Sequence, residues 1–227
     1  GDAYDFRPAA TSVFNALFGT DLNQSQYLNV KSQSQELRLT SPTGGTVAWI
    51  AGAYYVHTKR FISTGNMVDT GAGVFPVYRA PRLTGNNPSS TFLADSQNND
   101  AWAVFANATV ELSENMQFDA ALRYDRDKRV NTTRTPTAFL PDPSARTGEV
   151  RTKTWDELQP KATLRYKPSE NTTLYTSWSR GFRSGGFNQT GVGAVANASG
   201  IAGVNDLFNA EVADTFEIGA KGRSEGG

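Results

Sequence analysis

The strongest constraint on this chain is a two-residue alternation of apolar and polar side chains that runs through long segments. Trp102, Val104 and Val110 occupy one parity, and Asn107 and Glu111 occupy the other. Successive side chains of a β-strand point to opposite faces, so this segment predicts a strand with one apolar and one polar face. Helical spacing is almost absent, and seven strands are predicted, at 33–41, 46–60, 98–112, 116–130, 153–167, 171–182 and 210–223.

The connections between these strands alternate in length. Three are tight and rich in turn residues, at 42–45, 113–115 and 168–170, and three are long, at roughly 61–97, 131–152 and 183–209. This order places all short turns at one end of an antiparallel up-and-down meander and all long loops at the other. Outer-membrane barrels have this asymmetry. The sequence therefore predicts an all-β fold and favours part of a transmembrane β-barrel.

Strand length and aromatic placement agree with a barrel. The predicted strands exceed the about five or six residues of a typical globular strand and suffice for the about 9–11 residues that cross a membrane at a tilt. Both phases of 46–60 remain open, because Trp49 to Tyr55 is apolar at both parities. Aromatic residues near the strand ends are typical of interfacial girdles; they are Trp102, Tyr124, Trp155 and Trp178 toward the long loops, and Trp49 and Tyr166 toward the short turns.

Composition excludes several other classes of protein. The chain has 22 Lys and Arg, 22 Asp and Glu, one His and no Cys. The charge balance gives no support for nucleic-acid binding, and the absence of Cys excludes disulfides, thiolate metal sites and Cys nucleophiles. No run of 18 apolar residues predicts a transmembrane helix. We expect no catalytic residues, no metal site and no cofactor, and therefore no enzyme.

Four sequence strings carry a resemblance to a known family. They are Ser34 to Pro42 (SQELRLTSP), Trp49 to Tyr55 (WIAGAYY), Leu174 to Asn188 (LYTSWSRGFRSGGFN) and Glu217 to Lys221 (EIGAK). In this order, and over roughly 33–223, the chain resembles the barrel of TonB-dependent outer-membrane receptors. The resemblance implies a bacterial outer-membrane transporter with about 22 strands and a plugged lumen, of which seven strands form about a third.

The resemblance also implies a domain plan and partners. Residues 1–32 are expected to be an external segment leading into the barrel, 33–223 a partial barrel, and 224–227 a turn at a truncated end. The implied partners are outer-membrane lipid, the remaining strands, a plug domain, and TonB acting through an N-terminal box; plug and box lie outside this sequence. The implied cargo is a scarce ligand, most often a ferric siderophore, with vitamins, haem and oligosaccharides as alternatives, imported by the pull of TonB on the plug.

Two other functions remain open from the sequence. A passive, porin-like barrel needs neither plug nor TonB. A soluble carbohydrate-binding β-sandwich shows the same alternation, with its aromatic residues in a core and its charged face in water. Loop asymmetry and strand length favour the membrane barrel over the sandwich.

Candidate ligand-binding residues lie where a strand enters the last long loop. Arginine pairs with anionic ligands, and aromatic rings stack on cations and sugars. The five candidates are Arg180, Phe182, Arg183, Phe187 and Asn188. The alternative is that the neighbouring glycines shape a bend between strand and loop and the charges decorate the rim.

The polar parity of the strands supplies a second set of residues. Mixed charges on this face are expected to line the lumen, where they pair across strands or meet the plug. The predicted wall residues are Glu36, Arg38, Glu111, Arg123, Glu157, Lys161, Arg165, Glu217 and Lys221.

Overall fold

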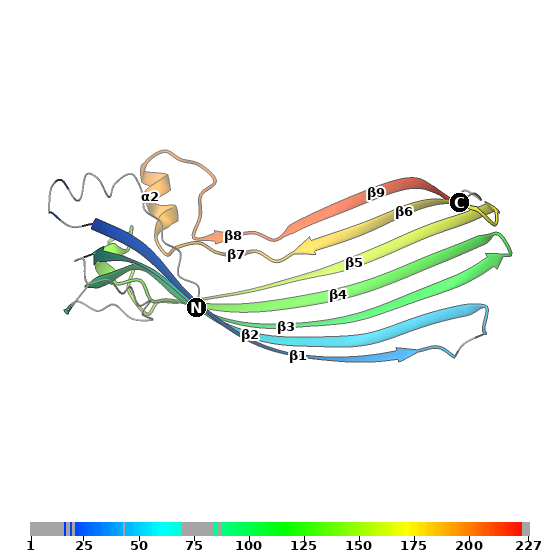
Figure 1. Cartoon of the computed structure of the whole chain (residues 1–227), viewed down its shortest axis with the longest axis horizontal. Coiled ribbons are helices and arrows are strands. Elements are labelled where there is room, and N and C mark those ends of the chain that lie inside the picture. Colours follow the sequence, from blue (N-terminus) through cyan, green and yellow to red (C-terminus); the bar gives the residue numbers. More distant parts are fainter. Residues whose placement is uncertain are drawn as a thin grey trace.

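The computed structural model describes residues 21–42, 44–69 and 88–223, together with Ala16, Gly19, Thr84 and Gly85. These residues form one seven-stranded antiparallel sheet in the order β1-β2-β3-β4-β5-β6-β9 (Figure 1). Every strand pairs with its neighbour in sequence except across the short elements between β6 and β9. The strands are β1 (Asp21–Thr40), β2 (Val47–Asp69), β3 (Ser89–Ser113), β4 (Met116–Thr133), β5 (Val150–Ser169), β6 (Thr172–Arg183) and β9 (Glu211–Gly222).

The short connections lie together at one end of the sheet, and the described parts of the longer ones lie at the other end (Figure 1). The turns β1–β2, β3–β4 and β5–β6 share the end at which β9 stops. The opposite end carries the small elements of the loops. They are the 3₁₀ turn η1 (Thr137–Phe139), the helix α2 (Val192–Ala198), and the paired short strands β7 (Gly186–Phe187) and β8 (Leu207–Phe208). The predicted meander and its loop asymmetry are confirmed.

Several strands reach farther toward the long loops than predicted. Strand β1 begins at Asp21, so 21–32, expected in an external segment, pairs with β2. Strand β2 continues to Asp69 and β3 starts at Ser89. The alternation did not reveal these extensions because polar residues occupy both parities there. The rest of the expected 1–32 segment falls almost wholly outside the described residues, and the expected turn at 224–227 lies outside them.

The register resolves which side chains share a face. Ala53 lies opposite Val104, and Val104 lies opposite Tyr124. This fixes the open phase of β2, with Trp49 and Tyr55 on the apolar face. Large apolar side chains on this face are strongly exposed: Leu37 by 68%, Phe216 by 78% and Ile218 by 87%. No other sheet packs on this apolar face in the described part of the chain.

The opposite, polar face carries every residue that the sequence predicted for the barrel wall. For example, Asp125 lies opposite Glu157, Gln117 opposite Arg165, and Ser177 opposite Glu217. Cross-strand neighbours on one face stabilise a sheet when their charges are opposite or their polar groups bond. The full predicted set shares this face: Glu36, Arg38, Glu111, Arg123, Glu157, Lys161, Arg165, Glu217 and Lys221.

One aromatic residue was assigned to the wrong face. Trp155, expected in the interfacial girdle, lies opposite Asp127 on the polar face and is only 6% exposed. The loop after β6 covers it, because the ring of Phe187 lies edge-on at 6.0 Å. Trp102, Tyr124 and Trp178 do lie on the apolar face, toward the long loops. No helix of the described part is long and apolar enough to cross a membrane.

Two glycines on the polar face lie beneath aromatic rings of the neighbouring strand. Gly52 is opposite Phe105, and Gly219 is opposite Tyr175. A Cβ on Gly52 would lie 2.5 Å from the carbonyl oxygen of Leu37 and 2.6 Å from Cζ of Phe105. An aromatic ring that covers a glycine in this way fixes the register of two strands. Only a glycine at position 52 therefore allows β1, β2 and the ring of Phe105 to pack this closely.

Gly52→Ala should destabilise the sheet by about 1–3 kcal/mol, because the backbone oxygen of Leu37 cannot move aside without breaking the ladder. The matched control is Gly181→Ala in β6, whose Cβ would meet nothing nearer than 3.9 Å. The stability of both variants is measured as the midpoint of urea unfolding, followed by tryptophan fluorescence. Equal midpoints for the two variants would contradict this packing.

Candidate functional site

The largest fully buried side chains of the described chain are polar and lie near the long loops. Asn131 is 1% exposed, and Thr133 and Thr135 are buried as completely. Thr135 bonds to the backbone of Ala94 through its hydroxyl, and Thr133 bonds to Thr190 of the last loop. Buried polar groups need such partners to offset their lost hydration. Hydrogen bonds between buried polar groups thus help to attach the loops to the wall.

Arg151 of β5 is the main attachment of the loop between β6 and β9. Its Nη1 donates to the carbonyl oxygen of Asp206 at 3.0 Å, and its Nη2 donates to the carbonyl oxygen of Asn188 at 2.8 Å and to Oδ1 of Asn131 at 3.0 Å. The guanidinium also lies 5.2 Å from the centre of the Phe187 ring. Charge-assisted bonds of this kind are roughly twice as strong as neutral ones. Arg151 therefore holds both arms of the loop against β4 and β5.

Arg129 of β4 makes a second attachment. Its Nη1 donates to the carbonyl oxygen of Gly185 at 2.9 Å, and its Nη2 lies 2.7 Å from Oδ2 of Asp127. The guanidinium lies 5.6 Å from the Trp155 ring. No Cβ fits at Gly185, because it would lie 2.2 Å from the carbonyl oxygen of Phe208. The entry into the loop is therefore packed closely against the polar face.

The loop also carries bonds of its own. The carboxylate of Asp206 accepts the backbone N–H groups of Gly191 and Gly193, both at 2.7 Å. Gly191 has φ of 90°, a left-handed conformation that favours glycine. Asn188 donates through Nδ2 to the carbonyl oxygen of Asn205 at 2.7 Å. These bonds join the two arms of the loop between β6 and β9. The loop therefore forms a compact cap over the end of the polar face.

Asp95 of β3 lies in the same polar cluster, outside the apolar band of the sheet. Burial disfavours its charged form and raises its pKa from the ordinary 3.8 to about 6. The positive charges of Arg151 and Arg60 and a hydrogen bond from Asn131 act in the opposite direction and lower the pKa. A proton on Asp95 therefore competes with its attraction to the loop-holding Arg151.

A cavity of about 320 Å³ opens below this cap on the polar side. Arg123 and Asp125 line it and pair through two bonds of 2.6 and 2.7 Å, and Gln159 donates to the same carboxylate. Phe182 and Ser184, at the end of β6, and Arg126 of β4 also line it. Arg123 and Asp125 satisfy each other, so the lining groups outside this pair include the ring of Phe182, the hydroxyl of Ser184 and the guanidinium of Arg126.

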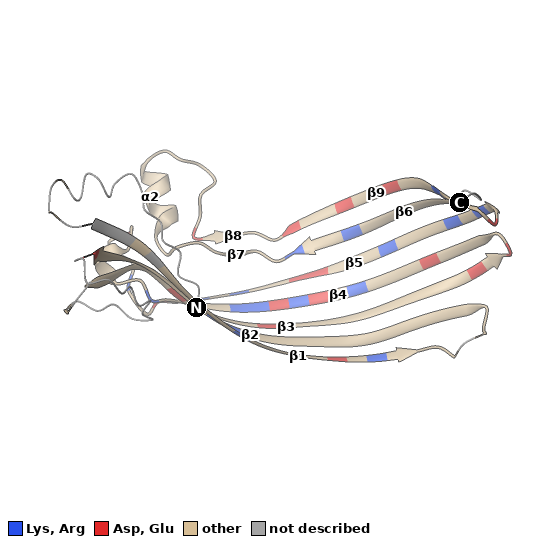
Figure 2. Cartoon of the chain, viewed as in Figure 1, with Lys and Arg blue, Asp and Glu red and all other residues tan. Residues whose placement is uncertain are grey.

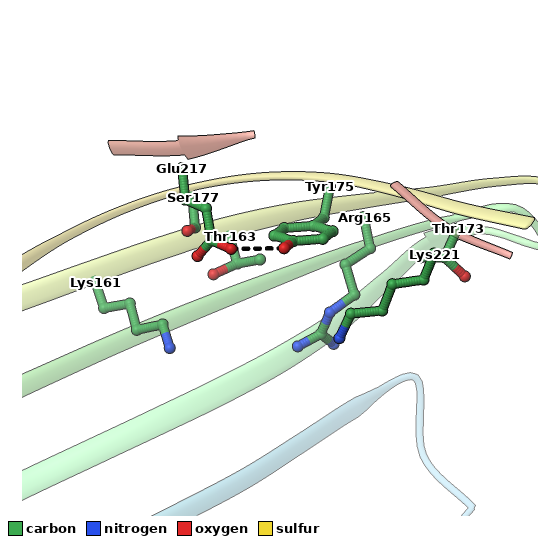
Figure 3. Close-up of a pocket in the computed structure, with 8 residues that line it drawn as sticks. All are labelled: Lys161, Thr163, Arg165, Thr173, Tyr175, Ser177, Glu217 and Lys221. Atoms are coloured by element: carbon green, nitrogen blue, oxygen red, sulfur yellow. Dashed lines mark hydrogen bonds between the residues drawn. The ribbon is translucent and has the colours of Figure 1, made fainter. Parts of the chain in front are cut away.

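A second cavity, of about 240 Å³, lies near the short turns. Figure 3 shows the side chains of Lys161, Arg165 and Lys221 extending to the same side of the sheet. The hydroxyl of Tyr175 donates to Glu217 at 2.6 Å, and Nζ of Lys221 lies 5.5 Å from the Tyr175 ring. Arg165 is paired with Asp119 of β4 at 2.9 Å. The lining of this cavity carries charges of both signs. It contains two lysines, Lys161 and Lys221, and one carboxylate, Glu217, which is bonded to Tyr175.

The five predicted ligand-binding residues are not brought to one place. Arg180 faces the same way as Trp178, pairs with Asp214 at 2.9 Å and lies 3.7 Å from Glu157. Phe182 lines the 320 Å³ cavity, while Phe187 and Asn188 are engaged by Arg151 within the cap. Arg183 is the most accessible, with its side chain 77% exposed and a single long bond to Glu211. The candidates therefore divide between the two faces and the cap.

Sequence reasoning missed the residues that hold the cap, which are Arg129, Arg151, Trp155, Asp206 and Asp95. The polar parity of β4 and β5 does continue to Arg129 and Arg151, so their face could have been inferred. Their partners could not, because Arg151 and Asp206 are 55 residues apart. In the described residues no cluster of acidic or histidine side chains is suited to a metal ion.

The whole sheet carries charge on one side and apolar side chains on the other. Figure 2 shows charged residues of both signs along β4, β5 and β9 and positive residues alone along β6, whereas β2 is almost free of charge toward the short turns. An exposed apolar face of this length, long strands, and loops at one end define the wall of a transmembrane β-barrel with a polar interior. The seven strands do not close, since β1 and β9 are the edges.

The family follows from the sequence as a whole. Residues 1–227 match the family model described as TonB dependent receptor-like, beta-barrel, so the chain belongs to that family. Members of this family are bacterial outer-membrane proteins, which places the chain in the outer membrane. The family is one of receptors and transporters rather than enzymes. The alternative of a soluble sandwich is thereby set aside. No curated protein matches the sequence.

Solved structures show the same fold at low sequence identity. The ferric yersiniabactin uptake receptor FyuA from Yersinia pestis has 16% identity and a TM-score of 0.63, covering 98% of this chain and 29% of that one. The siderophore receptor PiuA from Acinetobacter baumannii has 19% identity and a TM-score of 0.57, covering 96% and 33%. The ferric citrate transporter FecA has 17% identity and a TM-score of 0.56, covering 88% and 26%. The chain thus spans about a third or less of these receptors.

Arg151→Ala should release the cap from the wall. It removes three charge-assisted bonds, each worth about 1.5–3 kcal/mol, so the amides of the 186–208 loop should exchange with solvent at least tenfold faster. Hydrogen exchange of the folded protein measures this. Lys153→Ala is the matched control, because Lys153 is exposed two residues farther along the same strand and face. Unchanged exchange in the Arg151 variant would mean that the cap is held by other contacts.

Asp95 should make stability fall as pH rises. Its pKa is higher in the folded state than the ordinary 3.8. The stabilisation of the folded state by its protonated carboxyl is therefore complete below about pH 4 and is lost as pH passes about 6. Asp95→Asn should remove this decline, measured as the difference in urea midpoint from the parent protein between pH 4 and pH 7.

Asp142 provides a control of opposite sign. Hydrogen bonds from the backbone and side chain of Ser144 lower its pKa. Asp142→Asn should therefore have a lower urea midpoint than the parent above about pH 4, and this difference should shrink only as pH falls through the acid range. A flat difference for Asp95→Asn across pH 4–7 would contradict the assignment of Asp95.

Proposed function

We propose that this chain is part of the barrel wall of a receptor that binds a ferric siderophore outside the cell and imports it with energy supplied through TonB. The observation that carries the proposal is the family match over residues 1–227. The named fold relatives support the cargo class: one is a ferric yersiniabactin uptake receptor, one a siderophore receptor and one a ferric citrate transporter. A plug domain and TonB are the partners that such a mechanism requires.

The chemistry of the loop end of the polar face supports an anionic ligand. Arg183 presents a largely unpaired guanidinium at the point where β6 gives way to the cap. Phe182 offers an aromatic ring in the cavity beside it, near the pair Arg123 and Asp125. Guanidinium groups bind carboxylate and catecholate-type oxygens through parallel bonds, and rings add stacking. We propose that Arg183 and Phe182 make the ligand contact of this wall segment. Phe187 and Asn188 instead stabilise the cap. Arg180 stabilises the pairing of β6 with β9 through its ion pair with Asp214.

The wall residues have a separate role in this proposal. Lys161, Glu217 and Lys221 line the cavity near the short turns, where a plug would be enclosed by the barrel. Their mixed charges suit contacts with a polar plug surface. We propose that this end of the polar face holds the plug and that the loop end receives the cargo.

Growth and radiolabelled-iron uptake test the function directly. A strain lacking the receptor that contains this chain should lose uptake of its ferric siderophore, and so should the intact strain when TonB is removed. Uptake that persists without TonB would support a passive pore and overturn the proposal.

Arg183→Gln tests the ligand contact. It should raise the apparent KM for uptake about threefold to tenfold, because one exposed charge-assisted contact is worth roughly 1 kcal/mol. Arg223→Gln, at the short-turn end of the sheet, is the matched control and should leave the KM unchanged. Equal KM values for the two variants would remove Arg183 from the site without affecting the TonB result.

A further inference from the structure

The apolar face ends toward the long loops in a row of aromatic side chains bonded to carboxylates. The bonded pairs are Tyr55 with Asp100 at 2.8 Å, Tyr124 with Asp156 at 3.2 Å, and Trp178 with Asp214 at 3.2 Å. Aromatic residues with one polar atom prefer the boundary between lipid tails and water. This row therefore marks the level at which the membrane-facing surface passes from lipid tails to headgroups.

Two lysines lie beyond this row on the same face. Lys31 of β1 is directly opposite Lys59 of β2, and both side chains are exposed. Like charges directly opposite each other destabilise an antiparallel pair. Among the described residues, no ion pair joins a carboxylate to either lysine.

The nearest carboxylate of this face is already engaged. Asp100 lies opposite both His57 and Lys128, accepts a bond from Tyr55, and lies 2.7 Å from Nδ1 of His57. Its negative charge is thus shared among groups closer than the lysine pair. Lys31 and Lys59 together form a doubly positive point on a surface that offers them no internal counter-charge within the described residues.

The lysine pair lies within side-chain reach of a lipid headgroup. Lys59 is the second side chain of this face beyond Tyr55 along β2. At about 3.4 Å per residue and a tilt of about 45°, it lies roughly 10 Å outside the aromatic row. The polar layer of a bilayer is about 5–7 Å thick on each side, and a lysine stem lets its ammonium reach back several ångströms along the surface. Both ammonium groups can therefore meet charged headgroup oxygens.

We propose that Lys31 and Lys59 form a binding site for the phosphate group of an anionic lipid in the outer leaflet, on the membrane-facing side of the barrel. A phosphate between the two ammonium groups converts their repulsion into two attractive contacts. Asn98, which lies opposite Lys59 in β3, adds an amide donor at the same level. The site lies on the face opposite Arg183 and the two cavities, so it is independent of cargo binding.

The experiment uses the intact receptor that contains this chain, folded in dodecyl maltoside micelles. The probes are a phosphorylated lipid A, the same lipid A without its phosphates, and inorganic phosphate in the buffer. The thermal unfolding midpoint of the parent protein should rise with phosphorylated lipid A only. The double variant Lys31→Gln and Lys59→Gln should bind this lipid about thirtyfold more weakly, since each lysine near a charged surface contributes about 1 kcal/mol.

The matched control removes two lysines from the opposite face. Lys153→Gln with Lys167→Gln, two exposed lysines of β5, makes the same change in net charge and should leave the response to phosphorylated lipid A at the parent level. In micelles without phosphorylated lipid, the Lys31 and Lys59 double variant should be at least as stable as the parent, because the like-charge repulsion is gone. A merely structural role for the lysines predicts the opposite.

Three results would overturn the site. A double variant that responds to phosphorylated lipid A as the parent does would mean that a carboxylate outside the described residues serves the pair. Full stabilisation by inorganic phosphate at millimolar concentration would make the site one for free anions. A loss of stability in the double variant without any lipid would make the pair structural.

Discussion

The fixed parity of the hydrogen-bonded ladder is the constraint on which the rest of this structure depends. Once Ala53 is paired with Val104 and Val104 with Tyr124, every other side chain of each strand is committed to one face. A slip of one residue would move Arg123 and Glu157 into lipid, where charges are costly. Backbone groups inside a membrane must also be paired, so the same ladder that assigns the faces satisfies the backbone across the apolar band.

The polar side that results is organised by charge from one end to the other. Near the short turns, lysines and Glu217 border an open cavity; farther along, Arg123 and Asp125 satisfy each other; beyond them, Arg129 and Arg151 hold the cap. From the short turns toward the long loops, more of the charged side chains are therefore bonded to other groups of the chain.

The sequence predicted some strands closely and others poorly, for physical reasons. Strand β4 was predicted at 116–130 and is observed at Met116–Thr133, because a tight turn precedes it and apolar residues alternate through most of its length. Strand β1 was predicted to start at residue 33 and starts at Asp21, because its outer part is polar at both parities and gives no alternation. Trp155 was misplaced because an aromatic residue near a strand end suits a lipid interface and a covered polar face equally well.

The sequence by itself determined the class of fold, the seven strands and the two faces, since these follow from a local period of two and from turn residues. Only the tertiary structure decided which of the charged residues are available. Arg151 and Asp206, 55 residues apart, become partners because the last loop folds back over β4 and β5. Lys31 and Lys59 become a like-charged pair because the register of two strands sets them opposite each other. Contacts between distant segments depend on how the chain closes in space, and no local pattern encodes them.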